Sequence, residues 1–172
     1  SIHPDIFDMR SSEILMEKSG IPYTILRPNT FMQNFNNHEK NSIINKHAFY
    51  YPAGLGKTSF IDTRDISQAA ANILLNDNHI NKIYTLTGIE SLNYYQVAEL
   101  ISNAYGHSIR YIDTSTHPEL ESAEIKTIIG QNFFSGVRNN LFSEVTQDLK
   151  KLLTSSAGIR TFKQYAEDYW IN

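Results

Sequence analysis

The sequence predicts an α/β fold, in which helices wind a mostly parallel sheet on both faces and a smaller, mostly helical lobe follows. Short β-branched runs alternate with longer stretches whose apolar residues recur at helical spacing. Glycine or proline stands at many of the boundaries between them. The length of 172 residues, with 41% hydrophobic and 19% charged residues, is typical of a globular chain that buries one good core.

The first strand is predicted inside the stretch from Ser19 to Phe35. Gly20 ends a helix, and Tyr23 to Leu26 form a nearly continuous apolar and β-branched run, as in a parallel strand buried on both faces. Arg27-Pro28 is expected to end this strand, because proline has no N–H for the ladder. The loop that follows leaves the carboxyl end of the strand, where ligands bind in open α/β sheets.

Helices are predicted on both sides of this strand. The upstream helix is expected to start at His3-Pro4-Asp5, with Pro4 in the first turn and Asp5 near the positive end of the helix dipole. A second helix is predicted to begin at Phe31 and to run through Ile44. Residues 49–51 follow as a short aromatic strand.

The segment Gly54-Leu-Gly-Lys-Thr58 has part of a phosphate-binding loop but lacks its context. The full motif requires glycine where Tyr51 stands, and a helix must follow directly so that its N-terminus can hold the phosphate. Phe60-Ile61 is instead an extended apolar pair. We therefore interpret the glycines as a turn, with Lys57 at a pocket edge or in solvent.

Asp65 is predicted to cap the next helix, because apolar residues follow it at helical spacing: Ile66, Ala69, Ala70, Ile73 and Leu74. Asp62 and Arg64 are neighbours for which a surface ion pair is the commoner outcome, although both could line a pocket. Further along, Ser91 is predicted to cap a helix that ends at Gly106.

Two strand pairs, of which the first is parallel, are expected from this alternation. Residues 23–26 are predicted to pair with residues 83–87, and residues 49–51 with residues 109–112 in a second small sheet. From Pro118 onward the pattern is helical, and the apolar positions are Phe134, Val137, Leu141, Val145, Leu149, Leu152, Leu153, Ile159, Phe162, Ala166 and Tyr169 or Trp170.

Composition argues against several functional classes. The net charge is −3, and the absence of a lysine or arginine run argues against direct nucleic-acid binding. No apolar run approaches the roughly 20 residues of a membrane span. The six histidines have no metal-ligand spacing, and there are no cysteines, so we predict no metal site and a cytoplasmic location.

Four segments carry a family resemblance: the stretch from Ser19 to Phe35, Ser59-Phe-Ile-Asp-Thr-Arg-Asp-Ile66, Ile83-Tyr-Thr-Leu-Thr-Gly88 and Arg160-Thr-Phe-Lys-Gln-Tyr-Ala-Glu-Asp168. In this order they resemble the C-terminal part of an NmrA-like, atypical short-chain dehydrogenase/reductase. The resemblance implies a partial Rossmann-like doubly wound sheet. Residues 1–90 then form part of an NAD(P)-binding domain, with a small-lobe strand near 49–51, and residues 91–172 form the substrate lobe.

The resemblance also implies where a cofactor binds. NADP or NAD is expected to bind the intact protein with its nicotinamide beside Pro28, Asn29, Thr30 and Phe31. Many members carry a lysine on the preceding helix, and Met9 stands at that place here. Methionine can neither donate to a ribose nor lower the pKa of a hydroxyl. The usual Tyr-x-x-x-Lys pair is also absent, so the catalytic residues stay unassigned.

Two functions remain open under this resemblance. One is an NAD(P)H-dependent oxidoreductase that reduces a quinone-like or other conjugated small molecule. In that case Phe133, Phe134 and Phe142 line a pocket for a flat substrate, although core packing is the commoner role of such residues. The other is a non-catalytic NAD(P)-sensing regulator that binds a partner protein.

A glycine-rich dinucleotide loop is missing from the sequence. Neither Gly-x-Gly-x-x-Gly nor the family's Gly-x-x-Gly-x-x-Gly follows a strand, and the chain begins at Ser1. We therefore expect that the N-terminal dinucleotide-binding half is absent and that this chain alone is inactive. Its expected partners are a small-molecule substrate and either the missing half or further copies of itself, because half a doubly wound sheet leaves an open edge.

Overall fold

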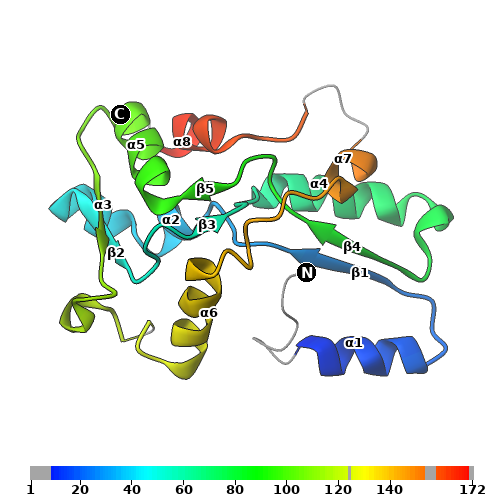
Figure 1. The fold of residues 1–172 in the computed structure, drawn as a ribbon. Coiled ribbons are helices and arrows are strands. Elements are labelled where there is room, and N and C mark those ends of the chain that lie inside the picture. The colour runs from blue at the N-terminus through cyan, green and yellow to red at the C-terminus, as the bar shows by residue number, and fades with distance from the viewer. Residues whose placement is uncertain (1–8, 124, 154–157, 171–172) are drawn as a thin grey trace.

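The computed structural model describes residues 9–123, 125–153 and 158–170 (Figure 1). The predicted helix start at residues 3–5 lies outside these ranges. The strands are β1 (Thr24–Pro28), β2 (Ala48–Tyr51), β3 (Lys57–Thr58), β4 (Lys82–Leu86), β5 (Leu92–Asn93) and β6 (Arg110–Asp113). The helices are α1 (Met9–Lys18), α2 (Asn34–Asn37), α3 (Lys40–Lys46), α4 (Thr63–Leu74), α5 (Tyr94–Tyr105), α6 (Ile128–Arg138), α7 (Asp148–Leu152) and α8 (Phe162–Trp170), with short 3-10 turns η2 (Asp77–His79) and η3 (Pro118–Leu120).

Both predicted strand pairs are confirmed, and both are parallel. β1 pairs with β4 so that Leu26 lies opposite Tyr84, and β2 pairs with β6 so that Phe49 lies opposite Tyr111. A third pair, the two-residue strands β3 and β5, is antiparallel and was not predicted. The turn at Gly54 leads into β3 rather than a helix, so this segment lacks the geometry of a phosphate-binding loop.

The two faces of β1 contact different helices. Arg27 points toward α1, where it binds Glu13, whereas Leu26 on the opposite face packs with Tyr84 against α4 and α7. The cluster on that face is Ile61, Ala69, Leu86, Leu149 and Leu152. Helices therefore lie on both faces of this parallel pair, which confirms the predicted doubly wound α/β arrangement.

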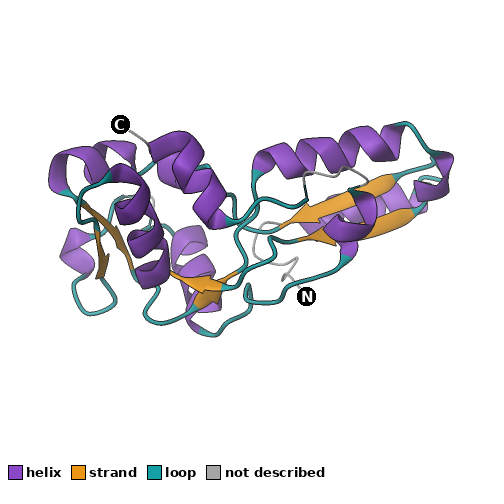
Figure 2. Cartoon of the chain, turned by 90° about the horizontal axis from the view of Figure 1, so that it is seen from above, coloured by secondary structure: helices purple, strands orange, loops and turns teal. Residues whose placement is uncertain are grey.

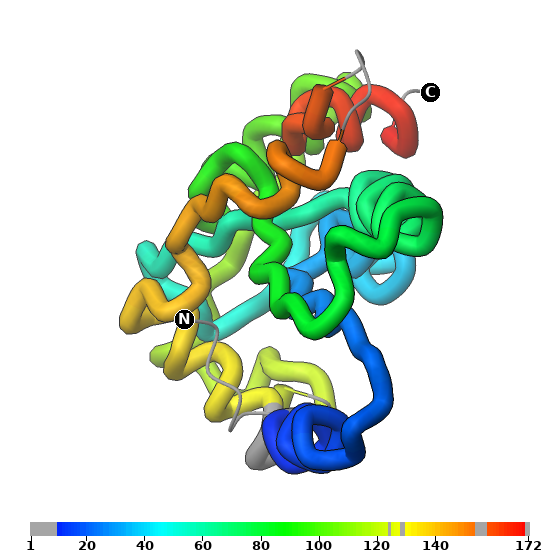
Figure 3. The backbone as a smooth tube through the Cα atoms, turned by 90° about the vertical axis from the view of Figure 1, so that its right-hand side faces the viewer, coloured from blue at the N-terminus to red at the C-terminus, as the bar shows by residue number. Residues whose placement is uncertain are grey.

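An aromatic core holds the other end of the molecule together. The Phe35 ring lies 5.4 Å from Phe49 and 5.5 Å from both Phe60 and Phe162, in edge-to-face geometry. Figure 2 shows the helices that pack around this aromatic core at one end of the molecule and β1, β4 and α4 at the other. In Figure 3, α5 and α8 lie on the side of the molecule opposite α1.

β1 extends two residues past Leu26, the end of the predicted run, and ends at Pro28. Pro28 lies opposite Leu86, and the next ladder bond comes from the Asn29 main-chain N–H to Leu86 O at 2.8 Å. In a parallel pair, alternate N–H groups point away from the neighbour. Proline is tolerated at such a position, since the N–H that it lacks is not used between β1 and β4.

Two predicted helix caps are wrong by a few residues. Asp62, not Asp65, is the N-cap of α4, and its carboxylate accepts the Arg64 main-chain N–H at 2.8 Å. Asn93, not Ser91, caps α5 in a reciprocal capping box with Gln96. In both cases the sequence offers two capping side chains within three residues, and the structure uses a residue with extended backbone just before the first turn.

Two predicted helices are shorter than their apolar spacing suggested. The helix from Phe31 to Ile44 is divided into α2 and α3, because asparagine and histidine, which are poor helix formers, occupy residues 36–38. The helix through Phe134 ends at Arg138, since Asn140 adopts a left-handed φ of 57°. Leu141 and Val145 therefore lie outside it.

The cap assignment predicts the effect of two alanine substitutions. Asn93→Ala should lower the free energy of unfolding by about 1 kcal/mol, because it removes the acceptor for the Gln96 N–H. Ser91→Ala is the matched control: Ser91 Oγ is buried and has no hydrogen-bond partner among the described residues, so its loss should cost less than about 0.5 kcal/mol. Urea denaturation measures both, and a larger effect at Ser91 would contradict the assignment.

Candidate functional site

The loop Pro28–Phe31 leaves β1 at its carboxyl end, as predicted. Beyond Pro28, the Thr30 carbonyl accepts the Ile61 N–H at 2.9 Å, and the Ile61 carbonyl accepts the Met32 N–H at 2.9 Å. Phe31 and Ile61 thus form a parallel bridge that extends the pairing past the sheet. These main-chain bonds hold the loop against the segment around Ile61.

The Asn29 side chain is committed to contacts within the protein. It is only 4% exposed. Its amide nitrogen donates to Ser59 Oγ at 2.7 Å and to the Phe142 carbonyl at 2.9 Å, while its oxygen accepts the Thr30 N–H at 2.8 Å. These bonds use both N–H groups of the amide and one acceptor position of its oxygen.

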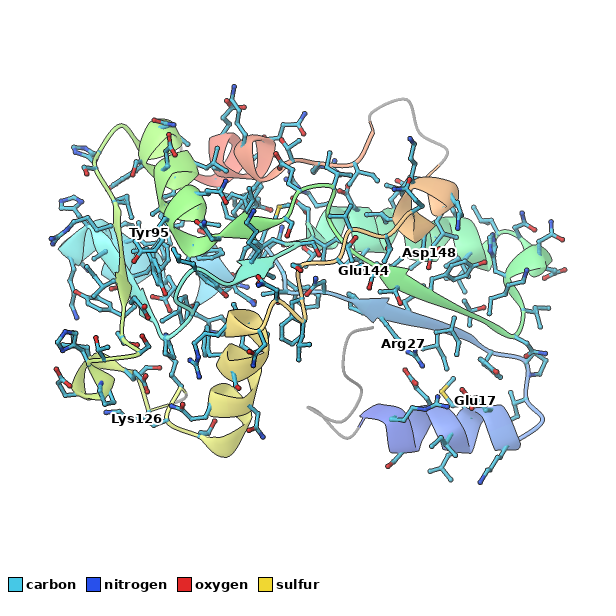
Figure 4. The ribbon with its side chains drawn as sticks, viewed as in Figure 1. Glu17, Arg27, Tyr95, Lys126, Glu144 and Asp148 are labelled. Carbon is cyan, nitrogen blue, oxygen red and sulfur yellow. The ribbon has the colours of Figure 1, made fainter. Side chains whose placement is uncertain are left out.

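Residues 142–148 cross the carboxyl ends of β1 and β4, and we call them the strap. Ser59 Oγ donates to the Glu144 carbonyl at 2.6 Å. At the β4 end, the Thr146 N–H donates to Thr87 Oγ1 at 2.9 Å, and the Asp148 carboxylate accepts the Thr85 N–H at 3.1 Å. Figure 4 shows Glu144 and Asp148 along this segment, between α6 and α7. The strap therefore connects the C-terminal part of the chain to the edge of the sheet from which the loop Pro28–Phe31 emerges.

The four predicted cofactor-binding residues differ in how far they are exposed to solvent. Asn29 is buried, Pro28 and Thr30 are half-buried, and the Phe31 side chain is 37% exposed. An exposed phenyl ring fits one face of a flat, conjugated ring. No charged side chain belongs to this loop, and the sequence has no glycine-rich loop, so these residues fit the nicotinamide end of a dinucleotide and not its pyrophosphate.

A network of charged residues fixes α1 to β1. Arg27 Nε and NH2 donate to the two Glu13 carboxylate oxygens at 2.8 and 2.6 Å, and Arg10 bonds to both Glu13 and Glu17. Figure 4 shows Arg27 and Glu17 facing one another from the two elements. The Arg27 guanidinium, with help from Arg10, lowers the pKa of Glu13 despite its burial. The side chain of Met9, at the start of this helix, lies outside the described residues.

The phenylalanines considered for a substrate pocket lie in the core or against it. Phe134 and Phe142 are 5% and 3% exposed, and half-buried Phe133 packs 5.0 Å from each of their ring centroids. Gly136 leaves room for the Phe142 ring, whose edge would lie 2.8 Å from an added Cβ. Phe134 and Phe142 therefore have the alternative role named from the sequence, which is core packing.

Sequence reasoning missed the residues that hold the strap, namely Ser59, Thr85, Thr87 and Thr146. Their one signal in the sequence is position, since Ser59, Thr85 and Thr87 each lie at the end of an extended segment. Hydroxyl residues are, however, common at such positions.

A hollow of about 400 Å³ lies at the amino end of β1, lined by residues that include Pro22, Tyr23 and Ile80. Within the described ranges, neither a cluster of three metal-ligating side chains nor a helix able to cross a membrane is present.

The chain is similar to reductases of known sequence. It is 38% identical over 97 residues to an NAD(P)H azoreductase of Xenophilus azovorans, an alignment that covers 56% of this chain and 34% of that protein. The structure resembles the NADPH-dependent quinone oxidoreductase of Escherichia coli, with a TM-score of 0.78 and 19% identity over 94% of this chain and 60% of the other. The chain thus spans well under two thirds of each.

Similarity extends to a protein that is described as a regulator. The negative transcriptional regulator NmrA, solved in complex with NADP, gives a TM-score of 0.67 at 16% identity, covering 94% of this chain and 56% of that one. At such identities the two solved structures establish the fold alone. The NmrA-like family model, however, matches residues 3–166. The chain therefore belongs to the NmrA-like family.

Proposed function

We propose that this chain supplies the nicotinamide side and the substrate lobe of an NAD(P)H-dependent reductase that acts on quinone-like or other conjugated small molecules. The observation that carries the proposal is the loop Pro28–Phe31, which leaves the carboxyl end of β1 and exposes an aromatic ring. The names of the azoreductase and the quinone oxidoreductase, both for conjugated acceptors, support the substrate class.

The chain's own residues orient reactants rather than perform the chemistry. A nicotinamide cofactor, when bound, supplies the hydride. Phe31 offers a flat apolar face, and the strap holds this edge rigid through Asn29 and Ser59. Hydride transfer needs mainly close and oriented approach of donor and acceptor, and a fixed apolar surface that excludes water provides this.

The second candidate function is a non-catalytic NAD(P)-sensing regulator that binds a partner protein. Met9 favours it, since a thioether cannot replace the lysine that many family members carry at this place. The buried tyrosines Tyr94, Tyr111 and Tyr165 offer no substitute acid, because burial raises the pKa of each phenol. A regulator would use the same loop to hold the cofactor but would not reduce an acceptor.

We also propose that a further polypeptide covers the open side of β1, either an N-terminal dinucleotide-binding half or another copy of this chain. Among the described residues, β1 pairs with β4 alone. Apolar side chains near its amino end are exposed: Ile21 by 69%, Ile80 by 46%, and Leu74 and Leu75 by 86% each. We retain the division into residues 1–90 and 91–172 and the cytoplasmic location as proposals.

Dinucleotide binding tests both functional candidates. Isothermal calorimetry of this chain together with the proposed N-terminal dinucleotide-binding half should detect binding of NADPH or NADH. Phe31→Ala should weaken that binding up to about tenfold, because an aromatic contact contributes roughly 0.5–1.5 kcal/mol. Leu55→Ala is the matched control: Leu55 is 75% exposed on a turn outside the loop and should leave binding unchanged. An intact protein that binds neither dinucleotide would exclude the reductase and the sensor alike.

The open edge predicts the behaviour of the 172-residue chain by itself. Apolar burial contributes roughly 25 cal/mol per Å², so a few hundred Å² left uncovered costs several kcal/mol, comparable to the whole stability of a domain. In analytical ultracentrifugation the isolated chain should self-associate, and it should form a stoichiometric complex with a supplied N-terminal half. A monomer that melts sharply would show that this chain closes its own core.

A further inference from the structure

Asp62 is a fully buried carboxylate that four donors share. Its oxygens accept the Gln33 amide at 2.9 Å, the Arg64 main-chain N–H at 2.8 Å, and Arg64 Nε and NH2 at 3.0 and 2.6 Å. Burial by itself raises the pKa of Asp62, but the hydrogen bonds from Arg64 and Gln33 outweigh it, and the net shift is downward. Asp62 is therefore held as an ionised group at the start of α4.

Gln33 connects this carboxylate to the candidate cofactor loop. Its amide nitrogen donates to Asp62, and its oxygen accepts the Thr63 N–H at 3.1 Å, so the side chain binds the start of α4 through both ends. Gln33 follows Phe31 by two residues, and its carbonyl accepts the Asn36 N–H at 3.1 Å within the turn that begins at Phe31. A movement of Asp62 is therefore transmitted to the turn that carries the exposed ring.

Arg64 connects the same carboxylate to the C-terminal helix. Its NH1 nitrogen donates to Asp168 at 2.6 Å, and its guanidinium lies 5.3 Å from the ring centroid of Tyr169. Arg64 thus binds Asp62 side-on while its remaining nitrogen reaches α8, 104 residues away in sequence. The planar guanidinium suits this double contact, which an ammonium group cannot reproduce. Figure 1 shows the start of α4 beneath α8.

We infer that Arg64 is a positioning residue: it sets the Phe31–Gln33 turn relative to α8 through the series Gln33, Asp62, Arg64 and Asp168. That this turn binds a cofactor rests on the proposed function. The series of contacts from Gln33 to Asp168 does not. The turn belongs to the edge of the sheet and α8 belongs to the lobe. Arg64 therefore fixes the separation between the Phe31–Gln33 turn and α8.

A second link separates this role from general stabilisation. Asp65, one turn into α4, accepts the Arg160 main-chain N–H at 2.8 Å and also binds the Arg160 guanidinium. This ion pair ties the segment before α8 to α4, and within the described residues neither of its side chains hydrogen-bonds to Gln33 or to the Asp62 carboxylate. Arg160→Gln is therefore a matched control, since it removes a comparable ion pair between the same two parts of the chain but leaves the connection to the turn intact.

Amide hydrogen exchange of the intact protein, followed by mass spectrometry, tests the link. Arg64→Gln should accelerate exchange of residues 31–36 and of α8 by about tenfold or more, because hydrogen bonds to charged groups are worth roughly that factor in an opening equilibrium. Asp168→Asn should accelerate both segments, although Asp168 itself belongs to α8 and reaches the turn only through Arg64. Arg160→Gln should accelerate the start of α8 and leave residues 31–36 unchanged.

Three outcomes would overturn the inference: unchanged exchange at residues 31–36 in Arg64→Gln, an equal effect of Arg160→Gln there, or an effect of Asp168→Asn confined to α8. Should Arg64→Gln not fold, Arg64→Lys replaces it and should show an intermediate acceleration. Calorimetry adds a separate arm, in which Arg64→Gln weakens NADPH binding and Arg160→Gln does not. Absence of binding in the parent protein refutes the proposed function, whereas the exchange result decides the role of Arg64.

Discussion

The buried amide of Asn29 is the contact on which the carboxyl end of the sheet depends. A strand that ends beneath another segment leaves polar groups that must find partners away from water. Asn29 meets this requirement by bonding Ser59 and the Phe142 carbonyl, and Thr85 and Thr87 do the same at the end of β4. Because these bonds hold the strap in place, Pro28–Phe31 leaves the sheet on a fixed path and presents only the Phe31 ring.

Two connections of different chemistry hold the lobe to this edge. Neutral hydrogen bonds from Asn29, Ser59 and the threonines hold the strap, and buried carboxylates on α4 hold α8. Removing one partner of a buried charged group is costly, because the remaining charge has lost its water as well as its partner. Asp62 and Asp65 therefore make the approach of α8 to α4 specific.

Local sequence patterns predicted the elements with strong periodicity and the pairing of their strands. The β-branched runs gave both parallel pairs, and the stripe after Asp65 gave α4, because one face of each is buried. The predicted N-caps of α4 and α5 were displaced, because two neighbouring side chains can cap each helix. These are Asp62 and Asp65 for α4, and Ser91 and Asn93 for α5. The strap was not predictable, because its partners lie far away in the chain: Ser59 meets residues more than 80 positions later, and no local preference records such contacts.

We propose the carboxyl end of β1 as the cofactor site, although a hollow of about 400 Å³ lies at the amino end of the same strand. Amide chemical shifts recorded while NADPH is titrated into the intact, isotope-labelled protein distinguish the two ends directly. We expect the largest changes within this chain on Asn29, Thr30, Phe31 and Met32. Changes concentrated on Tyr23, Thr24 and Ile80, with that loop unaffected, would contradict it.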